Sequence, residues 1–494
     1  MSKPLLNESR VWRGHWWPPG EQDVAMPGTL TYRPDKGLTL ELIGGWDTKV
    51  WEEVRPGVFE TSDSEDSRRW PVLHGLAENR EITLLDCLPT HTASRNFGPP
   101  DEQTIHVLTV LSGIHVDTAD QALFTECHVA VEDLTMWSQS SVISGSLRTK
   151  EGRRNGTGYI VTEPVEDPST IVNGVVTSLV HEHTLPHVEN TRGGSVGRMR
   201  ETRFVRFQPS EPWSLQIAQE HAKMVQDLLS LALNRPCGLL WTRLRMPPEE
   251  RDYPEGYPIR DREIDLYAQQ IVPAEPSAKA VRNRHALFTC EHLPFEEVWP
   301  RWCEVREQCL RAADMILGLR YAPARFIEGR LLTATGAAEV LHRALGKVSP
   351  PIPADEFSAM RRTLLEHTPD KYRTWVRQKL RNEVTLKDRL RDLAKLPDSE
   401  AMGHLVPDVE CWATVTTQAR NDLTHEGHTR RQSIDEVIVA VKVTSAVVVM
   451  NLLEALGVPS ERQREIIRDH PELCHTAQQA HDYLASKPSP REPV

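Results

Sequence analysis

DVECWATVTTQARNDLTHEG, residues 408–427, is the stretch that predicts the fold most directly. Its apolar side chains recur mostly every three or four positions and share one face of an α-helix: Trp412, Val415, Ala419 and Leu423. Asp408 is a suitable N-cap, and Gly427 is a typical residue at which a helix stops. We therefore predict one amphipathic helix of a bundle, with His425 in its last turn.

A second, strongly apolar helix is predicted directly after it. Ser433-Ile434-Asp435-Glu436 has the pattern of a capping box, and Gly457 with Pro459 ends the apolar run. The run is about as long as a membrane span. Four polar residues interrupt it: Lys442, Ser445, Asn451 and Glu454. Because a charge within a span is costly, we predict a buried helix of the bundle and no membrane partner.

Helical periodicity begins upstream, at Phe295. An apolar stripe with mostly three- to four-residue spacing follows: Trp299, Trp302, Val305, Cys309 and Ala312. Three further helices are predicted: 326–345, 354–366 and 371–395. We assign residues 295–460 to one helical bundle and residues 461–494 to a short helical tail.

Residues 1–294 have a different composition. Short apolar and β-branched runs, separated by Pro and Gly turns, predict a largely antiparallel β domain with one helix at 214–233. The clearest strand candidates are 29–32, 38–43, 82–85, 104–111, 159–161 and 171–183. Three tryptophans fall within Trp12 to Pro19, where they form either the core of this domain or an exposed recognition patch. The predicted fold class is α+β and multidomain, a β-rich N-terminal domain followed by an all-α helical bundle.

Composition and charge exclude several function classes. The 494 residues include 58 Lys and Arg against 70 Asp and Glu, a formal net charge of -12, so contact with nucleic acid must be local. The eight cysteines form no Cys-x-x-Cys pair, and the first ten residues lack an apolar signal region. We therefore expect reduced thiols and a cytoplasmic location. No Walker A loop, Gly-x-Gly-x-x-Gly turn or Gly-x-Ser-x-Gly elbow is present, which argues against NTPase, dinucleotide-binding and α/β-hydrolase functions.

Arg420, Asn421 and His425 carry groups suited to RNA cleavage without a metal. That reaction needs proton-transfer groups for the 2′-hydroxyl and the leaving 5′-oxygen, and a cation against the phosphorane. Asn421 and His425 share a helix face, whereas Arg420 lies about 140° and ~7.5 Å of rise from His425. One helix therefore makes a splayed site, which two copies facing each other would complete. The spacing alone is a weak signal, because similar Arg and His pairs recur along the chain and ordinary bundle residues would explain it.

Arg420-Asn421-x-x-x-His425 within a C-terminal bundle resembles the RNxxxH signature of HEPN-domain ribonucleases. Three N-terminal strings are similar to the N-terminal domain of the ApeA family of bacterial anti-phage proteins: WRGHWW at 12–17, PGTL at 27–30 and LELIG at 40–44. Three later strings resemble the ApeA-like bundle: FEEVWPRW at 295–302, EVLH at 339–342 and TLKDRL at 385–390. The similarity spans most of the chain.

The resemblance implies an endoribonuclease that acts in abortive infection and cleaves host RNA, with tRNA as the expected substrate, after a phage cue. It implies that Arg420, Asn421 and His425 are catalytic and that no metal or other cofactor is required. It also implies a homodimer or higher homo-oligomer, and a phage-derived trigger sensed through the N-terminal domain. Attack by the 2′-hydroxyl predicts products with 2′,3′-cyclic phosphate ends.

Further basic residues extend the candidate RNA contact. Three follow the motif directly: His428, Arg430 and Arg431. A basic helix end also compensates the helix dipole, so these three have two interpretations. The segment Asp370–Leu396 has nine Lys or Arg against four Asp or Glu, with Tyr372 and Trp375 interleaved. It either tracks an RNA backbone by charge and stacking or is a solvated helix face.

Three alternatives remain open. His181 and His183 share a strand face with Glu189 nearby, which is either a metal site loosely similar to the first cupin motif or a polar strand face. Glu339 and His342, on a predicted helix, are either accessory to the ribonuclease site or a surface pair. The third alternative is a dimeric interaction or sensor protein without catalytic activity.

Overall fold

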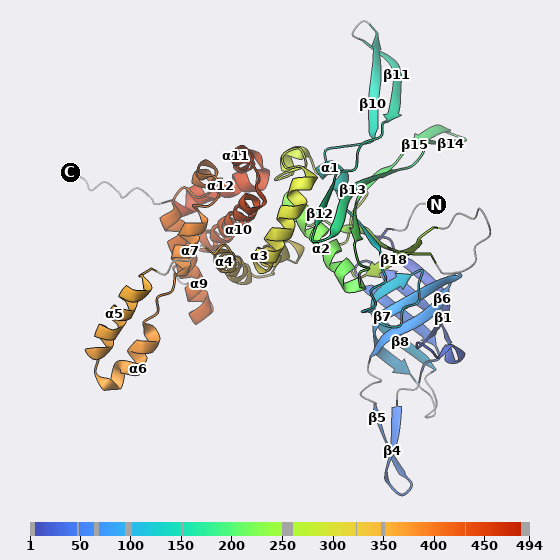
Figure 1. Cartoon of the computed structure of the whole chain (residues 1–494), viewed down its shortest axis with the longest axis horizontal. Helices are drawn as coiled ribbons and strands as arrows, with labels where there is room; N and C mark the ends of the chain where they lie inside the picture. The colour runs from blue at the N-terminus through green and yellow to red at the C-terminus, as the bar shows by residue number, and fades with distance from the viewer. Residues whose placement is uncertain are drawn as a thin grey trace. The chain divides into compact units, whose positions relative to one another are not determined.

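The computed structural model describes residues 5–46, 49–63, 69–93, 101–150, 153–248, 260–322, 324–346, 351–429 and 431–485. Contacts divide the chain into two compact units, Met1–Val281 and Arg282–Val494. The first is rich in strands and the second is helical (Figure 1), which confirms the α+β multidomain class. Residues 282–294 lie in the helical unit, where Arg462 donates hydrogen bonds to the carbonyls of Ala286 (2.8 Å) and Leu287 (2.9 Å).

Six antiparallel strands close into a barrel in the first unit. The order is β8-β3-β2-β1-β6-β7, and the barrel closes because β8 pairs with both β3 and β7. The six strands are β1 (Arg10–Trp17), β2 (Met26–Arg33), β3 (Gly37–Ile43), β6 (Trp70–Ala77), β7 (Arg80–Ala93) and β8 (Glu102–Ser112). Alternate side chains point inward, and their apolar members fill the interior.

The tryptophans of β1 belong to this core. Trp12 and Trp16 are fully buried, and Trp17 is nearly so. Gly75 of β6 lies opposite Trp16, and a Cβ atom there would come within 2.2 Å of the Trp16 ring. The core interpretation of the Trp12 to Pro19 cluster is therefore confirmed for its tryptophans, and an exposed recognition patch built on them is wrong.

The sheet continues beyond the barrel because the C-terminal half of β8 also pairs with β18. The extension runs in the order β18-β17-β9-β16-β13-β12. Its strands are β9 (Glu126–Val131), β12 (Ser169–Val172), β13 (Val175–His183), β16 (Glu201–Pro209), β17 (Leu239–Met246) and β18 (Arg262–Ala268). The predicted helix is α2 (Leu215–Ala232), which packs against β9 and β17. A short helix, α1 (Leu134–Trp137), lies beside it.

The prediction of a single strand over 171–183 is wrong. β12 and β13 form a hairpin in which Val172 pairs with Val175. Asn173 and Gly174 between them both have positive φ (50° and 78°), as a tight two-residue turn requires. Three more hairpins lie outside the main sheet (Figure 1): β4–β5 (Lys49–Arg55, Val58–Asp63), β10–β11 (Ile143–Lys150, Arg153–Thr162) and β14–β15 (His187–Thr191, Gly194–Arg198).

The second unit is a bundle built around one apolar helix, α10 (Ile434–Leu456), which contacts α3, α4, α9 and α12. The other helices are α3 (Phe295–Tyr321), α4 (Ile327–Ala344), α5 (Ala354–Glu366), α6 (Asp370–Lys379), α7 (Leu386–Leu393), α8 (Ser399–Leu405), α9 (Val409–Glu426), α11 (Ser460–Asp469) and α12 (Pro471–Leu484). By length and composition α10 is able to span a membrane, but 78% of its most apolar 18-residue stretch is buried inside the protein. The prediction of a buried bundle helix is confirmed.

The prediction of one helix over 371–395 is wrong. α6 ends at Lys379, and α7 begins at Leu386 with its own capping box, in which Thr385 and Asp388 bond reciprocally. Leu380 leaves α6 with an extended ψ of 97°. The chain therefore breaks, and α5 with α6 forms a helical hairpin separate from α7.

Candidate active site

Helix α9 holds the candidate site, and three features fix its position. Its apolar face joins a buried cluster with α4 and α10: Leu331, Ala419, Leu423, Val437 and Val441. The Asp408 carboxylate accepts a hydrogen bond from the Cys411 N–H (2.8 Å), and Gly427 ends the helix with a φ of 77°. The helix therefore has the bounds that the sequence predicts, with His425 in the last turn.

Arg420 lies on the border between the buried and the exposed faces of α9, with 34% of its side chain exposed. Its Nη2 lies 3.4 Å from the Glu339 Oε1 of α4, and its Nη1 donates to the Asn421 Oδ1 at 3.2 Å. Thr424 Oγ1 donates to the Arg420 carbonyl at 2.8 Å, as is usual in an exposed helical turn. The guanidinium is thus held at the helix surface by one carboxylate and one side-chain amide.

Asn421 and His425 are exposed and lie one turn apart on the same helix face. Among the described residues, the His425 ring has no hydrogen-bond partner. A cation, an amide and an imidazole are therefore all presented on the surface of the last two turns of α9. This set supplies the group types that phosphodiester cleavage through a neighbouring hydroxyl requires, on a surface that a large polyanion can reach.

The residues after α9 are only partly described. His428 is exposed, and its Nδ1 lies 3.1 Å from the Glu426 carbonyl. Arg431 is exposed as well. Arg430 lies outside the described residues. The RNA-binding role of these three residues stays a prediction.

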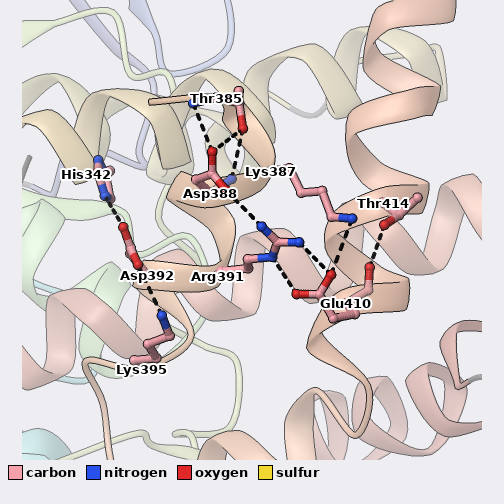
Figure 2. A network of polar contacts seen from close by, with 9 residues as sticks. All are labelled: His342, Thr385, Lys387, Asp388, Arg391, Asp392, Lys395, Glu410 and Thr414. Carbon is pink, nitrogen blue, oxygen red and sulfur yellow. Dashed lines mark hydrogen bonds and ion pairs between the residues drawn. The ribbon is translucent and has the colours of Figure 1, made fainter. Parts of the chain in front are cut away.

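The structure separates Glu339 from His342, which the sequence grouped together. Glu339 contacts Arg420, whereas His342 is buried and its Nε2 lies 3.2 Å from Asp392 of α7. Asp392 also pairs with Lys395 in the network that Figure 2 shows. Of the two, Glu339 alone lies beside the candidate site. Local sequence does not reveal this contact, because 81 positions separate Glu339 from Arg420.

A second part of the same network fastens the start of α9 to α7 (Figure 2). Arg391 bridges Asp388 and Glu410, and Lys387 pairs with Glu410 at 3.3 Å. The Arg391 hydrogen bonds lower the pKa of Glu410, and the Thr385 hydroxyl lowers that of Asp388. A lowered carboxyl pKa in the folded state stabilises the fold at higher pH, and this contribution is lost as the pH falls through the lowered value.

The alternative metal site at His181 does not assemble. The buried His181 ring lies 3.0 Å from Asp167 and 3.2 Å from the Arg203 guanidinium, whose charge disfavours a metal cation there. His183 is exposed at the end of β13, and Glu189 lies on the β14–β15 hairpin, paired with Arg198 at 3.5 Å. Across the described ranges, no group of three or more His, Cys, Asp or Glu side chains is placed to hold a metal ion.

Replacing Glu339 by glutamine is expected to lower the RNA cleavage rate about 10-fold, because Arg420 loses the carboxylate that orients its guanidinium. Stability should change by less than about 1 kcal/mol, since the pair is partly exposed. Cleavage kinetics and urea unfolding measure the two effects. Arg343→Gln is the matched control, because Arg343 contacts the same carboxylate only at 3.8 Å. A parental cleavage rate in Glu339→Gln would remove the positioning role.

Comparison with protein families assigns both units. Residues 11–302 match the family described as ApeA N-terminal domain 1, which covers more than half of the chain. The chain belongs to the ApeA family. Residues 332–462 match the Apea-like HEPN family, and this range includes Glu339 and all of α9. No curated protein and no solved structure gives a significant match. ApeA membership with a HEPN domain supports a role in anti-phage defence and a nuclease activity.

Proposed function

We propose that this ApeA-family chain is a metal-independent endoribonuclease that cleaves host RNA, with tRNA as the expected target, in abortive-infection defence against phage. One observation carries the proposal: Arg420, Asn421 and His425 all lie on the accessible C-terminal part of α9, inside the segment that matches the HEPN family. The enzyme uses no cofactor and acts in the cytoplasm. The alternative of a dimeric interaction protein does not account for this combination of side chains.

In the proposed reaction the ribose 2′-oxygen attacks the adjacent phosphorus. A base removes the 2′ proton as the O2′–P bond forms, and an acid donates a proton to the 5′-oxygen as the P–O5′ bond breaks. His425 supplies the proton-transfer group, and Arg420 stabilises the extra negative charge of the phosphorane. Asn421 orients a non-bridging phosphate oxygen by hydrogen bonding. The products are a 2′,3′-cyclic phosphate and a 5′-hydroxyl.

The proposed active unit is a homodimer or a higher homo-oligomer. The splay between Arg420 and His425 along α9 supports this assembly, because the two groups converge more easily across a pair of helices than along one. We assign the β-rich N-terminal domain to sensing a phage-derived trigger, which releases the nuclease by shifting a two-state equilibrium.

Cleavage is expected to survive chelation by EDTA and to leave 2′,3′-cyclic phosphate ends, because the attacking hydroxyl belongs to the substrate and needs no metal-bound water. DNA of the same sequence should stay intact, since it lacks the 2′-hydroxyl. The measurement is to incubate the purified chain with total tRNA, with and without EDTA, and to map the product ends by mass spectrometry. The His425→Ala chain, purified in parallel, reports any contaminating ribonuclease.

Two outcomes would contradict the proposal. Complete inhibition by EDTA that zinc or manganese reverses would indicate a metal-dependent enzyme. Absence of cleavage by the triggered chain under all conditions would favour the interaction protein.

A further inference from the structure

The hairpin formed by α5 (Ala354–Glu366) and α6 (Asp370–Lys379) has no buried residue in either helix. By contrast, α10 buries 15 of its 23 residues. Figure 1 shows the hairpin standing clear of the other helices of the bundle. An element that adds no buried residue to the core still costs conformational entropy to order, which favours a role for its exposed surface.

Internal hydrogen bonds hold the hairpin together. Arg373 Nε donates to the Leu365 carbonyl at 3.1 Å, and Arg361 Nη2 donates to the Arg377 carbonyl at 3.3 Å. At the base of the hairpin, Asn382 exchanges two hydrogen bonds with the backbone of Ile352 (2.6 and 3.1 Å). Arg361 and Arg373 therefore stabilise the hairpin itself, and the outer face of α6 is left to contact a partner.

The outer face of α6 combines aromatic and basic side chains. Tyr372, Trp375 and Lys379 follow one another at helical spacings of three and four, and Lys371 lies one turn before Trp375. Tyr372 is 51% and Trp375 61% exposed. Lys371 Nζ lies 4.8 Å from the Tyr372 ring centre. We call these four residues the α6 stripe.

We propose that the α6 stripe binds the substrate RNA, with Trp375 and Tyr372 stacking on loop bases and Lys371 and Lys379 contacting phosphates. This inference rests on the proposed ribonuclease function. The charge of α6 favours RNA, because the helix carries four Lys or Arg against one Asp, in a chain with a net charge of -12. That single acid, Asp370, is paired with Arg373 at 2.8 Å. Aromatic rings interleaved with cations form the surface on which unstacked bases bind.

The base of the hairpin lies beside the candidate active site. Arg389, at the start of α7, donates to the carbonyl of Val384 (3.2 Å) in the returning chain and approaches the Glu339 carbonyl at 3.5 Å. Glu339 in turn contacts Arg420. The ten residues of α6 span about 15 Å. An RNA bound along the α6 stripe would therefore cover roughly that length and would approach the base of the hairpin, which lies beside Glu339 and Arg420.

A second copy of this chain is the alternative to RNA as the partner of the exposed hairpin surface. Met360 and Leu364 on α5 are 38% and 43% exposed, and they offer an apolar surface for protein contact. The α6 stripe itself favours RNA, because lysines flank both of its aromatic rings. Charged residues, lysine among them, are depleted from the centres of protein interfaces.

The test measures RNA binding by the full-length chain carrying His425→Ala, which prevents cleavage during the measurement. The probe is a fluorescent stem-loop RNA, compared with a blunt RNA duplex. Trp375→Ala is expected to raise the dissociation constant for the stem-loop by about 5- to 100-fold and to change duplex binding little, because only loop bases are free to stack. Tyr483→Ala removes a comparably exposed ring from α12 and serves as the matched control.

The lysines are tested by salt dependence. The double variant with Lys371→Gln and Lys379→Gln should make the plot of log association constant against log salt concentration less steep by about 1.4. Each lysine that neutralises a phosphate of a single strand accounts for roughly 0.7 of that steepness. Arg311→Gln on α3 with Arg468→Gln on α11 removes the same charge elsewhere in the bundle and should leave the slope unchanged. In the cleavage-competent chain, Trp375→Ala should raise KM and leave the single-turnover rate at saturating RNA near the parental value.

The outcomes separate this inference from the proposed function. Equal RNA binding by the parent and the stripe variants would overturn the inference. It would leave the proposed ribonuclease function standing, because the cleavage assay tests that function separately. Weakened binding in the stripe variants, in a chain that cleaves no RNA, would support the inference and overturn the function. A change in mass by light scattering without a change in RNA affinity would assign the stripe to a second copy and overturn the inference. A parent that binds neither probe would also overturn it.

Discussion

Replacing His425 by alanine is expected to lower RNA cleavage by about 10²- to 10⁴-fold, the usual cost of losing a proton-transfer group. Replacing Arg420 by alanine should cost about 10²- to 10³-fold, because the phosphorane loses its stabilising cation. Both variants should stay folded. His425 is exposed, and Arg420 makes only partly exposed polar contacts, so the free energy of unfolding should change by less than about 1 kcal/mol. Cleavage assays and thermal unfolding of the same samples measure the two quantities.

His475→Ala is the matched control, since His475 is an exposed histidine on α12 with no link to the candidate site. Arg420→Lys adds a finer comparison, because it keeps the charge and loses the planar fork of donors. Intermediate activity in Arg420→Lys would indicate that the geometry of the donors matters as well as the charge. Parental cleavage by either alanine variant, or a melting temperature far below that of the parent, would reject the assignment.

Mixing His425→Ala subunits with Arg420→Ala subunits is expected to restore cleavage to two samples that are inactive alone. If each site takes Arg420 from one chain and His425 from the other, one of the two sites in every mixed dimer is complete. With random exchange half of the dimers are mixed, so the mixture should reach about a quarter of the parental activity. Native mass spectrometry of the mixture, with one subunit carrying a mass tag, measures the mixed fraction directly.

The control for this experiment mixes each inactive variant with itself under the same exchange conditions, which should restore nothing. The double variant with both substitutions, mixed with either single variant, should also stay inactive, because no complete pair of groups then forms. If mixed dimers are present and the mixture still fails to cleave RNA, the shared-site arrangement is wrong. Both residues would then have to act within one chain.

Much of the bundle was predictable from the sequence. The bounds of α9 and α10 follow from features within a few residues of each other: a capping side chain, an apolar period and a terminal glycine. The shared face of Asn421 and His425 follows from the same helical geometry. The α+β class followed from the change in periodicity along the chain, and the family resemblance is confirmed by the matched domains.

The errors fall where local pattern is ambiguous. A continuous helical period over 371–395 hid the break before Thr385, because the capping box there competes with continuation of the helix. The β-branched run over 171–183 hid a turn at Asn173 and Gly174, since both strands of that hairpin have the same composition. The metal interpretation of His181 gained no support, because Arg203 places a positive charge beside its ring and the described residues bring no group of three possible ligands together there. None of these three outcomes is encoded in the spacing of the residues themselves.

The helix that carries Arg420, Asn421 and His425, and the point where it ends, could be predicted from the chain alone, because capping and amphipathic period are properties of neighbouring residues. Three features emerged only on folding: Glu339 holds Arg420, β8 closes the barrel by pairing on both sides, and the α6 stripe stays exposed. These features join residues far apart in the chain. Their contacts depend on how whole elements pack, and burial of shared apolar surface, rather than any local preference, sets that packing.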